Sequence, residues 1–132
     1  MDGFAIVLSS DELERVQAVS IISSVAAASD IPVEIFVTMN GFRAFDKEVI
    51  QNRDFNGGEA AEAMMNAEDV EVPLYPEQLE QAKSLGPLSI HACEMTMELM
   101  GKSLDDMVEL FDGTLGVAGF LNAAEDKQVI FV

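Results

Sequence analysis

The first forty residues place two short apolar runs on either side of one helix-like segment, and this pattern constrains the fold most. Residues 3–10 (GFAIVLSS) and 31–39 (IPVEIFVTM) are typical of strands buried on both faces of a parallel sheet. The segment between them predicts an amphipathic helix that is capped by Asp11. Its apolar residues recur at spacings of three and four: Leu13, Val16, Val19, Ile22, Val25 and Ala26. Together these segments predict a right-handed βαβ unit.

The rest of the chain continues this alternation of strands and helices. We expect further helices over residues 40–50 (after a turn), 59–67, 76–86, 93–101 and 103–113, and further strands over 87–92, 115–120 and 128–132. Residues 51–58 are rich in turn formers and predict a loop that is free to move, while 68–75 fit either an edge strand or a loop. Because the alternation has no break, residues 1–132 are predicted to form one α/β domain.

Composition narrows the classes of partner. Nearly half of the 132 residues are apolar (49%), which excludes a disordered acidic tail. A net charge of -17 disfavours nucleic acid and anionic membrane surfaces, so a protein partner is expected to be basic. The acidic excess itself is most simply a solvated surface, suited to solubility or to high salt.

Targeting signals and metal motifs are not found in the sequence. No apolar run is long enough to span a bilayer, and the N-terminal residues lack the features of a secretory signal. One cysteine allows neither an internal disulfide nor a cysteine-rich metal site, so a cytoplasmic location is the expectation. There is no P-loop, HExxH or GxSxG motif, and no metal site is predicted.

Cys93 is the residue with the clearest chemical potential. It is the only cysteine, and it falls where a predicted strand passes into a helix. Ligands of open α/β sheets gather at the carboxyl ends of strands, and the first turn of a helix favours a thiolate over a thiol. Glu94 opposes this effect, and Arg43 is the cation expected to approach in space. Position alone favours an inert core residue, because free cysteines are among the most buried residues.

The supporting residues are predicted at the same edge of the sheet. His91 projects from its strand on the same side as Cys93, either as a thiol partner or as an ordinary core or surface histidine. Nearby methionines, including Met97 and Met100, fit packing better than a copper site. The candidates for supporting the site are His91, Glu94, Met95, Ser10, Asn40, Gly41 and Arg43.

The C-terminal third of the chain resembles the DsrE/DsrF-like family. The segment Ala92-Cys93-Glu94-Met95-Thr96-Met97-Glu98-Leu99-Met100-Gly101 is similar to the family pattern Ala-Cys-x-Met-Ser-Met-x-x-Met-Gly, with Thr96 in place of serine. The acidic segment SLDDMVELFDG and the closing GVAGFLNAAEDKQVIFV extend the resemblance over residues 88–132. The nearest subgroup is that of DsrE-like sulfur carriers, some of which are labelled "peroxiredoxin family protein". No peroxidatic Pro-x-x-x-Thr-x-x-Cys arrangement occurs here.

The resemblance implies a three-layer α/β/α sandwich with a mostly parallel sheet of about five strands. It also implies a homo-oligomer, as a trimer or a multiple of one, and a small TusA-like sulfur carrier as a partner. Cys93 would carry sulfur as a persulfide or S-thiosulfonate, as a sulfur carrier or sulfurtransferase that needs no cofactor. Other family cysteines are missing, so a persulfide on Cys93 could not be resolved into an internal disulfide.

Two further readings remain open beside the sulfur carrier. One is a non-catalytic binding or assembly module of the same fold, in which Cys93 only packs. The other is a peroxide-reactive thiol, which would need an external resolving thiol.

Overall fold

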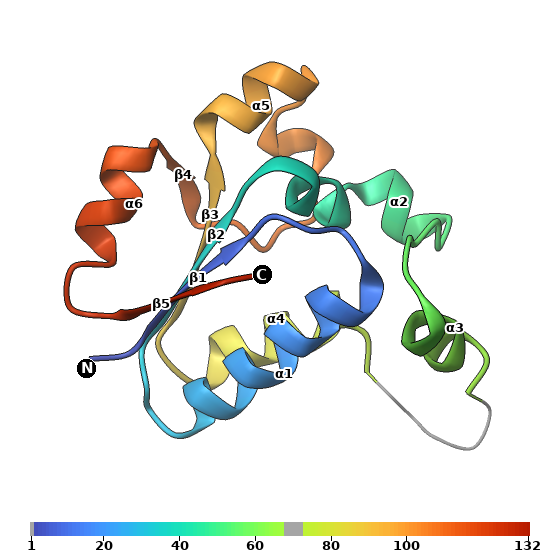
Figure 1. Cartoon of the computed structure of the whole chain (residues 1–132), viewed down its shortest axis with the longest axis horizontal. Coiled ribbons are helices and arrows are strands. Elements are labelled where there is room, and N and C mark those ends of the chain that lie inside the picture. Colours follow the sequence, from blue (N-terminus) through green and yellow to red (C-terminus); the bar gives the residue numbers. More distant parts are fainter. Residues whose placement is uncertain (1, 68–72) are drawn as a thin grey trace.

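A computed structural model describes residues 2–67 and 73–132, and a five-stranded parallel sheet lies at its centre (Figure 1). The strands are β1 (Phe4–Leu8), β2 (Val33–Val37), β3 (Leu88–Cys93), β4 (Gly113–Leu115) and β5 (Gln128–Phe131). Their order across the sheet is β4-β3-β2-β1-β5, and each neighbouring pair is parallel. The predicted α/β fold with a parallel sheet of about five strands is confirmed.

Helices flank the sheet unequally. The helices are α1 (Leu13–Ala28), α2 (Lys47–Gln51), α3 (Glu59–Met65), α4 (Tyr75–Leu85), α5 (Glu94–Met100) and α6 (Val117–Ala123), with 3₁₀ helices η1 (Met39–Phe45) and η2 (Leu104–Asp106). Helices α1 and α4 cover one face of the sheet side by side, and α6 lies on the opposite face (Figure 1). Helix α5 stands beyond the carboxyl end of β3, clear of both layers. The second helical layer is therefore only two turns long.

The face under α1 and α4, here called the first face, is an aliphatic core. Alternate residues of the three central strands point into it: Ile6, Leu8, Ile35, Val37, Ile90 and Ala92. Leu13 and Val16 of α1 and Leu79 of α4 close it from outside, each with 1% or less of its surface exposed. Burying one such side chain contributes about 1.5–3 kcal/mol, so this layer supplies most of the stability.

The opposite face, here called the second face, is smaller and only partly covered. Its buried residues are Ala5, Phe36, Cys93, Phe120 and Ala124. Phe120 of α6 stacks on Phe36 of β2, with ring centroids 4.7 Å apart. Further along this face, Val129 of β5 is exposed, and Phe131 is 74% exposed. Parallel sheets are normally covered on both faces, so this one leaves apolar surface in need of a partner.

The structure corrects two expectations in the C-terminal third. Residues 103–113 form no long helix: Ser103 and Asp106 make the capping-box contacts, but only the three-residue η2 follows. The next residue, Met107, forms an isolated bridge with Asp46. Residues 115–120 are not a strand either, because β4 ends at Leu115 and α6 begins at Val117.

The predicted helix α1 is present, but two details of its prediction are wrong. Asp11 does not cap it: Glu12 occupies that position without a side-chain cap, and the Asp11 carboxylate accepts hydrogen bonds elsewhere. Ile22 and Val25 are exposed rather than buried. Because apolar residues occur all around this helix, their spacing alone did not identify the buried side.

The loop expected over residues 51–58 is held by hydrogen bonds to α1. The carbonyl group of Asn56 accepts from the N–H of Leu13, and the N–H of Gly58 donates to Glu14. The expectation for residues 68–75 falls mostly on 68–72, which lie outside the described residues.

Candidate functional site

The carboxyl ends of β2 and β3 bring Thr38 and Cys93 together with the start of α5. Cys93 is the last residue of β3 and the N-cap residue of α5, with extended backbone angles. Thr38 follows β2 directly, and Thr96 lies in the first turn of α5. Thr38 is more than fifty positions from the other two residues in the sequence, and the parallel register of β2 and β3 brings it beside them.

Cys93 is enclosed on the second face of the sheet. Only 3% of its surface is exposed, and it packs with Phe36 and Phe120 in the small cluster under α6. Leu115 of β4 lies against the same cluster. The thiol is therefore not reached by solvent in this conformation, although it lies at the end of a strand, because residues of α6 pack against it.

Two threonine hydroxyls form a polar lining beside the thiol. The Oγ1 atoms of Thr38 and Thr96 are 3.2 Å apart, and the Met39 N–H donates to Thr96 Oγ1 at 2.9 Å. Thr96 Oγ1 thus accepts from Met39, and either threonine hydroxyl can donate to the other. Thr96 is 1% exposed, so its hydroxyl lies out of contact with water.

These groups set the ionisation of Cys93. Burial raises the pKa of the Cys93 thiol, but hydrogen bonding from the hydroxyls of Thr96 and Thr38 and from the backbone N–H groups of Thr96 and Met95 outweighs it. The net result is a pKa below the ordinary value of a cysteine. The environment thus favours an anionic sulfur through hydroxyl and N–H groups.

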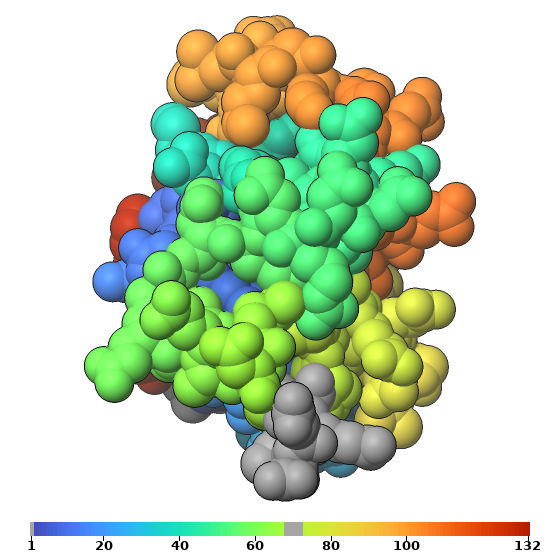
Figure 2. All heavy atoms as spheres, turned by 90° about the vertical axis from the view of Figure 1, so that its right-hand side faces the viewer, coloured from blue at the N-terminus to red at the C-terminus, as the bar shows by residue number. Residues whose placement is uncertain are grey.

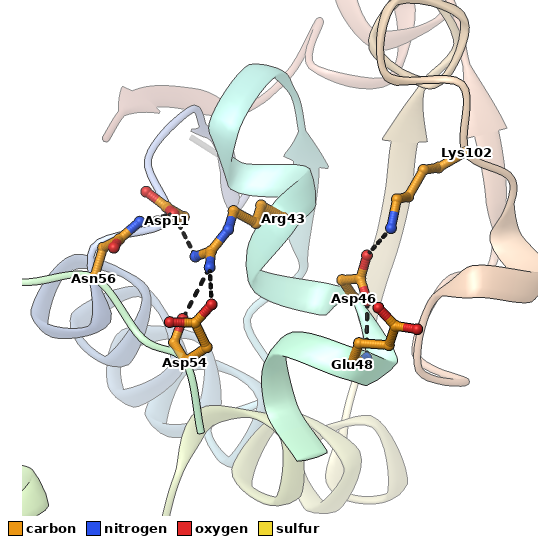
Figure 3. A network of polar contacts seen from close by, with 7 residues as sticks. All are labelled: Asp11, Arg43, Asp46, Glu48, Asp54, Asn56 and Lys102. Atoms are coloured by element: carbon orange, nitrogen blue, oxygen red, sulfur yellow. Dashed lines mark hydrogen bonds and ion pairs between the residues drawn. The ribbon is translucent and has the colours of Figure 1, made fainter. Parts of the chain in front are cut away.

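Arg43, the cation expected near Cys93, is engaged elsewhere (Figure 3). Its guanidinium group donates to Asp11 Oδ2 at 3.0 Å and to Asp54 Oδ2 at 2.9 Å. Asn56 Nδ2 donates to the same Asp11 oxygen at 2.7 Å. This network fixes the loop after α2 to the end of β1, so Arg43 has a structural role in this arrangement.

His91 lies on the same face as Cys93, as the alternation of the strand predicts, but it pairs with Glu34. His91 Nδ1 is 2.6 Å from Glu34 Oε1. Glu34 is buried in the middle of β2. Burial raises the pKa of Glu34, and the hydrogen bond from His91 opposes that rise only in part. The pair is a second polar feature of the second face, and His91 is not among the groups that shift the pKa of Cys93.

The remaining predicted residues are spread around the edge of the sheet. Glu94 and Met95 are exposed on α5, and Thr114 Oγ1 lies 3.5 Å from Glu94 Oε1. Ser10 Oγ accepts from the N–H of Glu12. Asn40 is exposed in η1.

Gly41, another predicted residue, has a packing role. A Cβ atom built at this position would overlap the carbonyl oxygen of Leu8. Gly41 therefore allows η1 to pack closely on the end of β1, and nothing in its surroundings assigns it a chemical role.

A second ion pair holds the far end of α5. The Lys102 ammonium group donates to Asp46, whose carboxylate also accepts from the Glu48 N–H at the start of α2 (Figure 3). Burial raises the pKa of Asp46, but the hydrogen bonds from Lys102 and from the Glu48 N–H lower it by a larger amount, so the net shift is downward. Together with Thr96, this pair anchors α5 at both ends.

Sequence reasoning missed Thr38, Thr96 and Glu34 as site residues. The sequence does contain a local signal for Thr96, because it lies three positions after the N-cap residue Cys93. At this spacing, the N-cap residue and the third helical residue contact each other through side chains and backbone N–H groups. No local signal exists for the pairing of Thr38 with Thr96, which are 58 positions apart.

The described residues contain neither a metal-binding cluster nor a membrane-spanning helix. Within residues 2–67 and 73–132, no three His, Cys, Asp or Glu side chains are grouped so that they could hold a metal ion. No helix in the same part of the chain is long and apolar enough to cross a membrane.

Comparison with known proteins places this geometry in a wider context. The model of the DsrE/DsrF/DrsH-like family matches the chain in two overlapping stretches, residues 2–84 and 54–132. The solved structure of a protein of unknown function, MTH1491 from Methanobacterium thermoautotrophicum, superposes with a TM-score of 0.67 and 14% sequence identity, over 100% of both chains. At that identity the likeness shows the fold alone. Among curated proteins, none matches the chain significantly.

Proposed function

The chain belongs to the DsrE/DsrF/DrsH-like family, and on that premise we propose that it is a sulfur-transfer protein that carries sulfane sulfur on Cys93. The observation that carries the proposal is the lining of Cys93 by the hydroxyls of Thr38 and Thr96. A carrier sulfur must be a good nucleophile when empty and a stabilised anion when loaded. Hydrogen-bond donors aimed at one buried sulfur serve both states.

The proposed reaction has two symmetrical steps. The Cys93 thiolate attacks the outer sulfur of a donor persulfide, so that a new S–S bond forms at Cys93, the donor S–S bond breaks and the donor leaves as a thiolate. An acceptor thiolate then attacks the outer sulfur on Cys93 and releases the Cys93 thiolate. The sulfane sulfur keeps its oxidation state throughout, so the cycle needs no external oxidant, reductant or organic cofactor.

The donors around the site would hold the loaded form in place. A persulfide extends one sulfur beyond Cys93, and its terminal atom carries the negative charge. The N–H groups of Met95 and Thr96 and the two hydroxyls already lower the pKa of the unloaded thiol, and they would stabilise the persulfide anion in the same way. Because the chain has a single cysteine, the loaded sulfur can leave only to another molecule.

Self-association is part of the proposal. Val117 and Leu121 of α6 and Val129 and Phe131 of β5 are all more than half exposed on or beside the second face. Residues 113–124 and 128–132 contain no charged side chain, in a chain of net charge -17. Two copies can therefore meet here without bringing carboxylates together. A trimer or a multiple of one is the expected assembly.

Mass spectrometry tests the sulfur-transfer proposal directly. After incubation with polysulfide, tetrathionate or a persulfidated donor, the intact protein is expected to gain mass corresponding to added sulfur, or to thiosulfate from tetrathionate. The variant Cys93→Ser should gain none. An unmodified wild-type protein, or equal adducts on the variant, would contradict the proposal.

The burial of Cys93 favours a second candidate, a non-catalytic binding or assembly module in which the cysteine packs against Phe36 and Phe120. The alkylation rate of Cys93 as a function of pH separates the two. A carrier predicts alkylation of the folded protein with a midpoint below that of a free thiol. A packing residue predicts no alkylation until the protein unfolds.

A further inference from the structure

Helix α5 exposes an apolar pair directly beside the carrier cysteine. Met95 is 58% exposed and Leu99 is 69% exposed, and their spacing of four places them on one side of the helix. Thr96, which contacts Thr38, lies about a quarter-turn away around the helix and is buried. Figures 1 and 2 show α5 at one end of the molecule, where its outer side meets no other element. This apolar pair is thus an unpartnered helix face next to Cys93.

An acidic groove lies along the neighbouring side of α5. Glu94 and Glu98 are exposed on α5, and both line an open groove of about 600 Å³ that Asp106 of η2 and Thr114 of β4 close from the other side. Lys102 is the cation in the groove lining, and its ammonium group is bound to Asp46. Over residues 2–67 and 73–132, no ion pair involves Glu94, Glu98 or Asp106. The groove therefore has a negative potential that the protein itself does not neutralise.

The charge of this surface argues against a two-fold contact with a second copy through α5. In a two-fold contact the same patch occurs on both subunits, so two copies meeting through α5 would oppose Glu94 and Glu98 with their own equivalents. Like charges brought together in this way are strongly unfavourable, and more so in a chain of net charge -17. The uncharged surface of α6 and β5 offers a contact between copies without that cost.

We propose that the outer side of α5 is the docking surface for an acceptor protein that presents a cysteine beside lysine or arginine residues and an apolar side chain. The inference rests on the sulfur-transfer function and names the class of its partner. The partner's cations would pair with Glu94 and Glu98, while its apolar residue packs on Met95 and Leu99. Methionine adapts its shape to different partners, and a surface this small gives a short-lived complex, as repeated sulfur delivery requires.

A disulfide-exchange assay tests the docking surface without any sulfane sulfur. The assay uses two peptides of equal length, and each contains one leucine and one cysteine that is activated as an aryl disulfide. The residues that flank the cysteine are lysines in one peptide and glutamates in the other. Cys93 attacks the peptide sulfur, a peptide–Cys93 disulfide forms and an aryl thiolate leaves. The wild-type protein should react about tenfold faster with the lysine peptide at low ionic strength, and the difference should shrink in 1 M salt, where charges are screened within about 3 Å.

Matched variants separate α5 from the rest of the acidic surface. Glu98→Lys should remove the preference for the lysine peptide, whereas Glu62→Lys, an equal charge change on the exposed side of α3, should retain it. Leu99→Ser should slow both peptides, whereas Leu85→Ser, at a position of α4 that is 66% exposed, should slow neither.

Three results would overturn the docking surface. They are equal rates for the two peptides, equal effects of Glu98→Lys and Glu62→Lys, and no reaction of the folded protein with either peptide. Loss of self-association in Leu99→Ser, seen by sedimentation velocity, would assign α5 to a second copy instead. The sulfur-transfer proposal can fail independently of the docking surface. In that case the protein still discriminates between the two peptides but gains no sulfur adduct.

Discussion

On β3, Ile90 and Ala92 point into the aliphatic core under α1 and α4, whereas the alternate residues His91 and Cys93 point to the face under α6. The first face is sealed by two long helices and contains hydrocarbon. The second face has one short helix and contains a buried carboxyl group that contacts a histidine, a thiol and exposed apolar surface. One strand thus serves both layers, because successive side chains of a strand point in opposite directions. The residues that stabilise the fold and the residues with reactive or ionisable side chains thus lie on opposite faces of one sheet.

The largest effect is expected from damage to the first face. Ile90→Ala should lower the free energy of unfolding by about 2–5 kcal/mol, because Ile90 is fully buried and its neighbours cannot fill the space. Urea unfolding monitored by circular dichroism measures this loss. The folded fraction of the variant should still acquire sulfur on Cys93. A variant that remains folded but takes up no sulfur would show that the two faces are coupled.

Removing a hydroxyl from the second face should change reactivity. Thr96→Val keeps the size of the side chain but removes a donor to the sulfur, and a hydrogen bond to a charged group is worth about 1.5–3 kcal/mol. Alkylation of Cys93 near neutral pH should therefore slow about tenfold or more, and its pH midpoint should move upward. Thr114→Val on the neighbouring strand is the control, since Thr114 is not among the groups that lower the pKa of Cys93. Equal rates in the two variants would remove Thr96 from the site.

The buried carboxylate of the second face predicts a pH dependence of stability. Since burial raises the pKa of Glu34, the folded state binds more protons than the unfolded state between the ordinary pKa of about 4.3 and the raised value. The free energy of unfolding contributed by Glu34 is thus greatest below that window and falls as the pH rises through it. Glu34→Gln should lack this decline, whereas the exposed Glu62→Gln should retain it. Urea unfolding over a pH series tests this, and identical pH profiles for Glu34→Gln and the wild type would contradict it.

The smallest effect on the single protomer is expected at the exposed end of β5. Phe131→Ser should change the free energy of unfolding of the protomer by no more than about 0.5 kcal/mol, because Phe131 is 74% exposed. Its effect should appear in assembly, as a lower mass in sedimentation velocity. A large loss of protomer stability without any change in assembly would place Phe131 in the core instead.

The sequence predicted secondary structure best where consecutive residues are apolar or where turn-forming residues mark both ends of an element. The strands β1 and β2 were predicted because side chains on both of their faces are apolar, and helix α4 because Pro76 near its start and Gly86 after its end bracket it. Helix α6 was missed because its apolar, glycine-containing sequence resembles a buried strand. Ser103 and Asp106 form the predicted capping box, but the chain then turns to pair Met107 with Asp46.

The site was less predictable than the fold because its contacts are long-range. Cys93 could be placed at a strand end from local pattern, but its cover comes from Phe120 and its donor from Thr38, both set by the tertiary arrangement. Glu34 lies within a strand-like run, and nothing local indicated that His91 would partner it. Arg43 was expected near the thiol from its place after β2, yet two aspartates closer to it determine its direction.

The packing of Cys93 in one buried cluster with the stacked rings of Phe36 and Phe120 has a kinetic consequence. With 3% of its surface exposed, Cys93 is shielded in this conformation, and a reagent reacts with it only while the covering residues are displaced. The reaction velocity then saturates as the reagent concentration increases, because each opening already ends in a covalent event. At saturation, reagents with very different intrinsic reactivities modify Cys93 with the same limiting rate constant. That rate constant is the rate at which the protein opens.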